Sequence, residues 1–240
     1  MTGPRALWRV TVGLRPWLCR CRLAASRSPE VSMSRTTRLA AALFALGFAI
    51  LQPYFGQQAG TVPAGIGYDT ANRCYAVVLA VLVWLCVLLR RRAGGAVATL
   101  GVVAAAVATA GVALEFWIGP LQDRPLSADA QRAGLPNSAI WWGSNVGFWA
   151  FAAAGIVLAA ATIVWSIRAG RRGALPRLVA LALGLTGPLI VVNFGLTNFG
   201  PVVAGAGGVL LAGAWLFAVL RDRERREAVQ ADRPAQHLVQ

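Results

Sequence analysis

The sequence contains no lysine and a single histidine, His237, which lies in the last few residues of the chain. The absence of lysine excludes Schiff-base catalysis, a lysine general base and a phosphate-binding loop that ends in Gly-Lys-Ser/Thr. Because no long apolar stretch holds a histidine, bis-histidine haem, histidine-bound zinc and Ser-His hydrolysis inside a membrane are excluded as well. The sequence therefore predicts no catalytic residue, no cofactor and no metal site, and it favours a non-enzymatic role.

Charged residues are also scarce. They make up 13% of the 240 residues, whereas 57% are apolar and the mean hydropathy is +0.60. A soluble domain carries about a quarter charged residues, so a water-soluble globule is excluded. The dominance of apolar residues also excludes a disordered chain. A long apolar chain with few charges is typical of an integral membrane protein.

Cysteine is limited to Cys19, Cys21, Cys74 and Cys86. The first two lack the Cys-x-x-Cys spacing of redox and zinc motifs. The last two share one expected helix, where twelve residues of separation amount to about 18 Å of rise. A disulfide needs Cα atoms closer than about 7 Å, so this pair cannot be bridged within one chain. The cysteines give no support for a thiol oxidoreductase.

Six apolar stretches are long enough to cross a hydrocarbon core, which takes about 20 helical residues. They are residues 39–55, 74–89, 95–118, 143–167, 178–196 and 201–220. Because the bilayer interior offers no water to unpaired backbone groups, stretches of this length predict helices. The predicted fold is an all-α integral membrane protein, a polytopic bundle of six transmembrane helices over residues 39–220. A basic arm, residues 1–38, precedes the bundle, and a charged tail, residues 221–240, follows it.

Arginine positions predict the orientation of this bundle. Twenty of the 23 arginines lie before the first stretch, between the second and third, between the fourth and fifth, or after the sixth. The other three are Arg73, Arg124 and Arg132. The positive-inside rule then places both termini in the cytoplasm of a bacterial cell, with the chain in its inner membrane.

The partner expected for these arginines is the bilayer itself, through anionic headgroups at the cytoplasmic face. Nucleic acid is not expected, because the basic residues lie beside apolar stretches rather than on one soluble face. A membrane-protein partner stays open.

Two alternatives for the N-terminal region stay open. Translation starting at Met33 would leave residues 1–32 untranslated, and Arg35 and Arg38 would still supply a basic flank. The first stretch also has the form of a signal peptide, but no small-x-small cleavage site follows Leu51 promptly, so an uncleaved helix is favoured.

Glu115 is the only acidic residue inside a predicted span, and it lies about one turn from the outer end. Intramembrane carboxylates are functional candidates by default. Arg73 flanks the preceding span, and an antiparallel hairpin brings the two residues to a similar depth. A structural ion pair between Arg73 and Glu115 is therefore expected, with a proton or ligand site as the alternative.

The fifth span contains Pro188, which predicts a kink, and Asn193 beyond it. Asn193 is expected to face the bundle and to bond a neighbouring helix, with Asn145 as a candidate partner. Asn198 lies in the outer turn that follows.

Three hypotheses for function follow from these residues. The first is a multi-pass membrane protein of unassigned, non-enzymatic role. The second is an outward-facing small-molecule transporter or ligand-binding protein. Its vestibule would be lined by Arg73, Glu115, Asn145, Asn193 and Asn198. The third is a membrane subunit that packs against a partner.

In the tail, Arg223 and Glu227 stand four residues apart, a spacing that predicts an ion pair on a helix.

Overall fold

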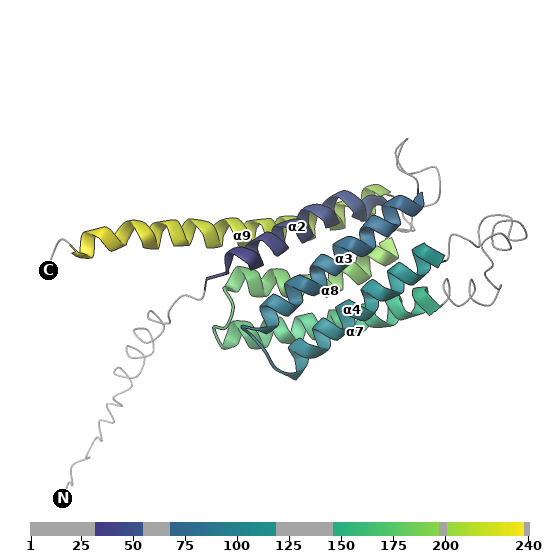
Figure 1. Cartoon of the computed structure of the whole chain (residues 1–240), viewed down its shortest axis with the longest axis horizontal. Helices are drawn as coiled ribbons and strands as arrows, with labels where there is room; N and C mark the ends of the chain where they lie inside the picture. The colour runs from purple at the N-terminus through teal and green to yellow at the C-terminus, as the bar shows by residue number, and fades with distance from the viewer. Residues whose placement is uncertain (1–31, 55–67, 119–145, 197–200, 238–240) are drawn as a thin grey trace, which may run out of the picture. The chain divides into compact units, whose positions relative to one another are not determined.

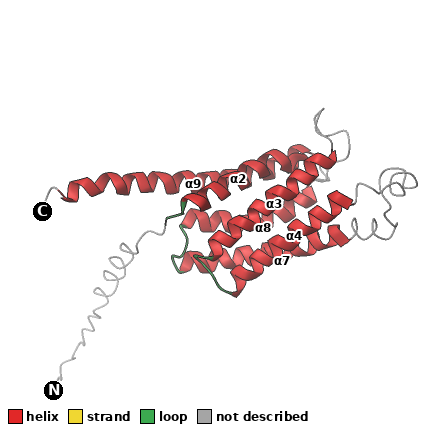
Figure 2. Cartoon of the chain, viewed as in Figure 1, coloured by secondary structure: helices red, strands yellow, loops and turns green. Residues whose placement is uncertain are grey.

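A computed structural model of the chain describes residues 32–54, 68–118, 146–196 and 201–237. The chain divides into two compact units, Met1–Glu30 and Val31–Gln240, and every described residue belongs to the second. Within the described ranges all regular structure is helical and no strand occurs (Figure 2). The elements are α2 (Arg35–Leu51), the short 3-10 helix η1 (Gln52–Tyr54), α3 (Tyr68–Arg90), α4 (Ala96–Ile118), α7 (Gly147–Arg171), α8 (Arg177–Leu196) and α9 (Pro201–His237).

Helices that are neighbours in the sequence are also neighbours in space, and the last helix returns to the first. α3 packs on α2 and α4, α7 packs on α4 and α8, and α9 packs on α8 and α2 (Figure 1). Short turns, residues 91–95 and 172–176, join α3 to α4 and α7 to α8. Successive helices therefore run in opposite directions, as expected of a chain that weaves across a bilayer.

Five of these helices, α3, α4, α7, α8 and α9, are long and apolar enough to cross a membrane. Their apolar parts have 19 to 25 residues, which matches the roughly 20 residues that a hydrocarbon core requires. Large apolar side chains such as Trp149, Ile156 and Val209 are exposed on them. This surface is typical of a helix bundle embedded in lipid. The predicted all-helical fold is confirmed for the described residues, and these five helices have the length and apolarity that a membrane span requires. α2, with 17 residues, is shorter.

The helices do not begin and end where the apolar stretches do. α3 begins at Tyr68, ahead of the predicted 74–89, and α7 covers Gly147–Arg171 where 143–167 was expected. α9 continues past residue 220 to His237. A helix is defined by its backbone hydrogen bonds and can therefore extend beyond the apolar stretch. Ion pairs between side chains four residues apart stabilise such an extension in water. The predicted pair of Arg223 and Glu227 is confirmed, with Nε and Oε1 2.7 Å apart.

Small residues bring the helix backbones close together. A Cβ added to Gly111 of α4 would lie 2.6 Å from the carbonyl oxygen of Gly147 on α7. A Cβ added to Gly187 of α8 would lie 2.5 Å from the Cα of Ala159 on α7. Such approaches are the usual means of packing helices in lipid, where burial of apolar surface gives no net driving force.

Candidate functional site

Arg73 and Glu115 lie on adjacent helices at the predicted outer end of the bundle. The Nε of Arg73 donates a hydrogen bond to the carbonyl oxygen of Phe116, 3.1 Å away. The guanidinium carbon lies 5.8 Å from the centre of the Trp117 ring, a cation–π contact. In the described structure Arg73 and Glu115 form no ion pair, so that expectation is wrong. Arg73 lies at a depth similar to that of Glu115, as predicted, but it contacts the two residues that follow Glu115 in the sequence, Phe116 and Trp117.

The backbone of Glu115 instead meets α7. A Cβ on Gly147 would lie 2.7 Å from the Glu115 nitrogen, and the Glu115 side chain is partly buried. Glu115 therefore lies at a close helix contact, where any larger residue at position 147 would separate α4 from α7.

Asn193 is fully buried on α8, facing the bundle as expected. Neither its Oδ1 nor its Nδ2 has a hydrogen-bond partner among the described residues. The amide lies directly against Gly207 of α9, which leaves no space there for a Cβ atom. The other two members of the predicted vestibule, Asn145 and Asn198, lie outside the described residues.

Gln52 is a further buried amide that the sequence reasoning missed. It is fully buried in η1, and its Oε1 accepts a hydrogen bond of 2.8 Å from the hydroxyl of Tyr75 on α3. Its Nε2 has no partner in the described structure. A Cβ on Gly208 of α9 would lie 3.0 Å from the Gln52 Cβ. The available signal was the pair of glycines at 207 and 208, which marks a place where side chains from other helices approach α9.

Asn193 packs against Gly207, Gln52 packs against Gly208, and Tyr75 donates a hydrogen bond to Gln52. These three polar side chains are called the outer amide cluster below. Asn193 approaches α9 from α8, and Gln52 approaches it from the side of α2. All three polar side chains are buried and none carries a formal charge. The cluster therefore offers neutral donors and acceptors, some of which have no partner among the described residues.

At the predicted cytoplasmic end, Asp222 joins the start of α2 to α9. Its two carboxylate oxygens accept the backbone N–H of Met33 at 3.0 and 3.2 Å. The Arg226 guanidinium donates to the carbonyl oxygen of Met33, and its Nε lies 3.8 Å from Asp222 Oδ2. Met33, Asp222 and Arg226 are called the α2–α9 clasp below. The side chain of Ser34 then caps α2 by accepting the N–H of Thr37 at 3.1 Å.

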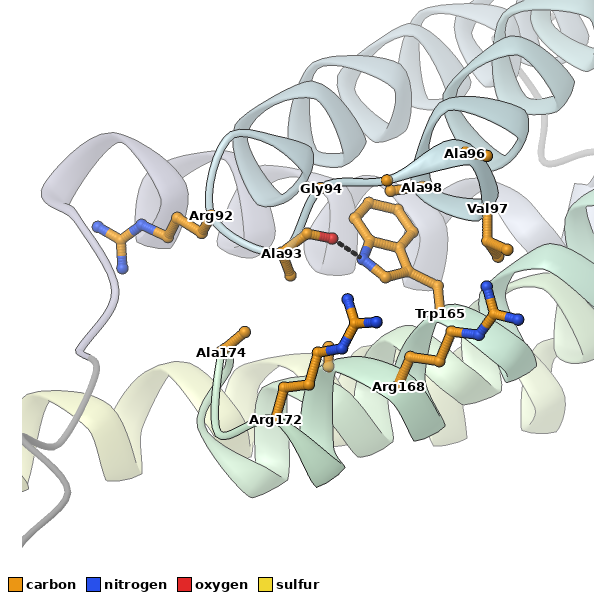
Figure 3. A pocket seen from close by; sticks show the side chains of 12 residues that line it. Arg92, Ala93, Gly94, Ala96, Val97, Ala98, Trp165, Arg168, Arg172 and Ala174 are labelled. Atoms are coloured by element: carbon orange, nitrogen blue, oxygen red, sulfur yellow. Dashed lines mark hydrogen bonds between the residues drawn. The ribbon is translucent and has the colours of Figure 1, made fainter.

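A second feature of this end is a hollow of about 390 Å³ between the α3–α4 turn and the end of α7 (Figure 3). Trp165 forms one wall, and its Nε1 donates to the carbonyl oxygen of Ala93 at 2.8 Å. Arg168 and Arg172 extend from α7 toward the turn, whereas the Arg92 side chain points away from the hollow. None of the described residues that line it is acidic. This hollow is called the basic pocket below.

The described part of the chain brings no three His, Cys, Asp or Glu side chains together as metal ligands would be. The chain matches no family model, no curated protein and no solved structure. Its function must therefore be argued from the outer amide cluster, the α2–α9 clasp and the basic pocket themselves.

Proposed function

We propose that the chain crosses the bacterial inner membrane six times, with both termini in the cytoplasm. The additional crossing is α2, whose 17 residues are extended by the three of η1. Together they approach the roughly 20 residues that a hydrocarbon core requires. One face of α2 supports this assignment by exposing a stripe of large apolar side chains, namely Leu39, Leu43, Leu46 and Ile50. An exposed stripe of this kind at helical spacing suits contact with lipid.

Labelling of single cysteines tests this topology. In a chain without its own cysteines, Ala128→Cys, between α4 and α7, is expected to react with a membrane-impermeant maleimide on intact cells. Gly170→Cys, exposed near the end of α7, is expected to react only after the cells are permeabilised. The opposite pattern would overturn the orientation. Reaction of both cysteines on intact cells would mean that α7, which lies between them, does not cross the membrane, and would overturn the six crossings.

We further propose that the protein binds a small uncharged polar solute from the outer side, as a ligand-binding protein or transporter, and catalyses no reaction. One observation carries this proposal: both polar atoms of the fully buried Asn193 are unpartnered in the described structure. A buried polar group without a partner costs about 1–3 kcal/mol, and the bilayer interior offers no water to offset that cost.

The chemistry of the outer amide cluster defines the class of solute. Among the described residues the donor and the acceptor of the Asn193 amide have no partner, and the Gln52 Nε2 adds a second unpartnered donor. Tyr75 already donates its hydroxyl proton to Gln52, which leaves the Gln52 amide nitrogen directed elsewhere. A neutral molecule with both hydrogen-bond donors and acceptors satisfies these groups, whereas an ion would find no opposite charge in the cluster.

Access of water to Asn193 tests this proposal. In the cysteine-free chain, Asn193→Cys is expected to react with a small cationic methanethiosulfonate added from outside. Val192→Cys is the matched control, because Val192 is at the same depth on α8 but is 50% exposed on the lipid-facing surface. A thiol in lipid stays protonated and unreactive. If Asn193→Cys reacts no faster than Val192→Cys, no polar path reaches the cluster and the solute site is wrong.

A further inference from the structure

The basic pocket at the opposite end of the bundle holds two guanidinium groups, those of Arg168 and Arg172. Trp165 and Arg168 are three residues apart on one face of α7, and Arg172, the residue that follows the end of α7, continues this spacing by four. That face is turned toward the α3–α4 turn (Figure 3). In the described structure neither Arg168 nor Arg172 forms an ion pair or a side-chain hydrogen bond. Arg92 differs, because its guanidinium donates to the carbonyl oxygen of Ser32.

The opposite wall of the basic pocket is the start of α4. Residues 96–98 line the pocket, and Gly95, with φ of 128°, turns the chain into the helix. The first intrahelical hydrogen bond from this turn is donated by the Thr99 N–H to the Gly95 carbonyl at 3.0 Å. The N–H groups of the three preceding residues therefore have no intrahelical acceptor, and they carry the positive end of the helix dipole.

Two independent sources of positive potential thus meet in one cavity, whose described lining residues include no carboxylate. A guanidinium presents a planar fork of donors that matches the oxygens of a phosphate, and helix N-termini bind the same group. We propose that the basic pocket binds the phosphate group of an anionic compound, either a phospholipid headgroup or a soluble phosphate ester. This site is separate from the outer amide cluster and does not depend on the function proposed for it.

The surroundings of the basic pocket favour the lipid source. Leu100 follows Val97 by three residues on α4, and Val164 precedes Arg168 by four on α7. Both side chains are exposed although both are apolar. The same helix faces that enter the pocket therefore continue toward the membrane as apolar surface, which suits the acyl chains of a lipid whose phosphate lies between the arginines.

Calorimetric titration of the purified full-length protein in a neutral detergent tests the proposal. The probes are dioctanoyl phosphatidylglycerol, dioctanoyl phosphatidylcholine and inorganic phosphate. Phosphatidylglycerol is expected to bind saturably, at least tenfold more tightly than phosphatidylcholine, and more weakly as salt rises. Saturable binding of inorganic phosphate with equal or greater affinity would assign the pocket to a soluble phosphate ester. The absence of saturable binding by both phosphatidylglycerol and phosphate would overturn the proposal, as would equal binding of the two lipids.

Charge-matched variants locate the site. Arg168→Gln with Arg172→Gln is expected to weaken binding of the preferred probe at least tenfold. Arg171→Gln with Arg177→Gln removes the same charge from the same end of the bundle outside the pocket, and a change below threefold is expected. Equal weakening by both pairs would overturn the assignment to this pocket. If the first pair does not purify as a folded protein, Arg172→Gln alone is used, with Arg171→Gln as its control.

Discussion

Met33 and Asp222 are 189 residues apart in the sequence, yet the backbone N–H of Met33 donates to both carboxylate oxygens of Asp222. Asp222 is 5% exposed, and Arg226 completes the α2–α9 clasp by binding the Met33 carbonyl. The clasp joins the first described residues to the last helix at the point where that helix leaves its apolar stretch. It is therefore the natural place to measure how strongly α2 is held to the other helices.

Replacing Asp222 with alanine is expected to lower the free energy of unfolding by about 2 kcal/mol. The Met33 N–H then loses its buried acceptor, and Arg226 loses the carboxylate that lies 3.8 Å from its Nε. A hydrogen bond to a charged group contributes about 1.5–3 kcal/mol. Thermal unfolding of the purified protein in detergent measures the change. Glu224→Ala is the control, because Glu224 is exposed and pairs only with the exposed Arg221, at 2.8 Å. Its expected effect is below about 1 kcal/mol, and equal effects of the two variants would contradict the role of the clasp.

Deleting residues 2–31 is expected to leave the melting temperature unchanged. The clasp begins at Met33 and the helix cap at Ser34, so the shortened chain retains every contact described for the start of α2. Thermal unfolding of the two lengths of chain provides the comparison. Asp222→Ala is expected to destabilise the shortened chain as much as the full one. A clear loss of stability on deletion alone would show that the N-terminal arm helps to hold the fold.

Gly111→Ala is expected to destabilise the protein by about 1–3 kcal/mol, because its Cβ would lie 2.6 Å from the Gly147 carbonyl oxygen and force α4 away from α7. Gly213→Ala is the matched control, since a Cβ at that helical position meets nothing within 4 Å. Both changes gain the same helix propensity, about 1 kcal/mol, so the difference between their melting temperatures isolates the contact. If Gly111→Ala is as stable as Gly213→Ala, α4 and α7 do not approach as described.

Asn193→Leu is expected to raise the melting temperature in the absence of solute. The substitution removes two unpartnered polar atoms and keeps a side chain of similar size, which relieves a penalty of about 1–3 kcal/mol. Thr186→Val on the same helix is expected to lower it, because the Thr186 hydroxyl accepts from Trp215 Nε1 at 3.0 Å and donates to the Ala182 carbonyl at 2.8 Å. Thermal unfolding of both variants gives the comparison. A loss of stability in Asn193→Leu would mean that the amide is already satisfied, contrary to the proposed solute site.

The helices were predictable because apolar length alone requires them in lipid. The apolar stretch 95–118 corresponds closely to α4, and 178–196 to α8. The ends of α3, α7 and α9 were less predictable, because a helix continues into water wherever its side chains permit. Asn193 was expected to face the bundle and does.

The partners of individual side chains could not be predicted in the same way. Depth along a helix follows from residue counting, but the rotation of one helix against its neighbour does not. Arg73 and Glu115 are therefore at similar depth without pairing, since Arg73 binds the Phe116 carbonyl instead. Gln52 was overlooked because it follows the last helical turn of its stretch, and its burial depends on Gly208 in a helix far along the chain.

α9 is one unbroken helix of 37 residues, about 55 Å long, whereas the hydrocarbon core is about 30 Å thick. One helix thus contains both the segment that contacts Asn193 and Gln52 and the segment that carries Asp222 and the charged tail. A displacement of α9 along its axis would therefore alter the packing of Asn193 and Gln52 and the hydrogen bonds to Met33 together.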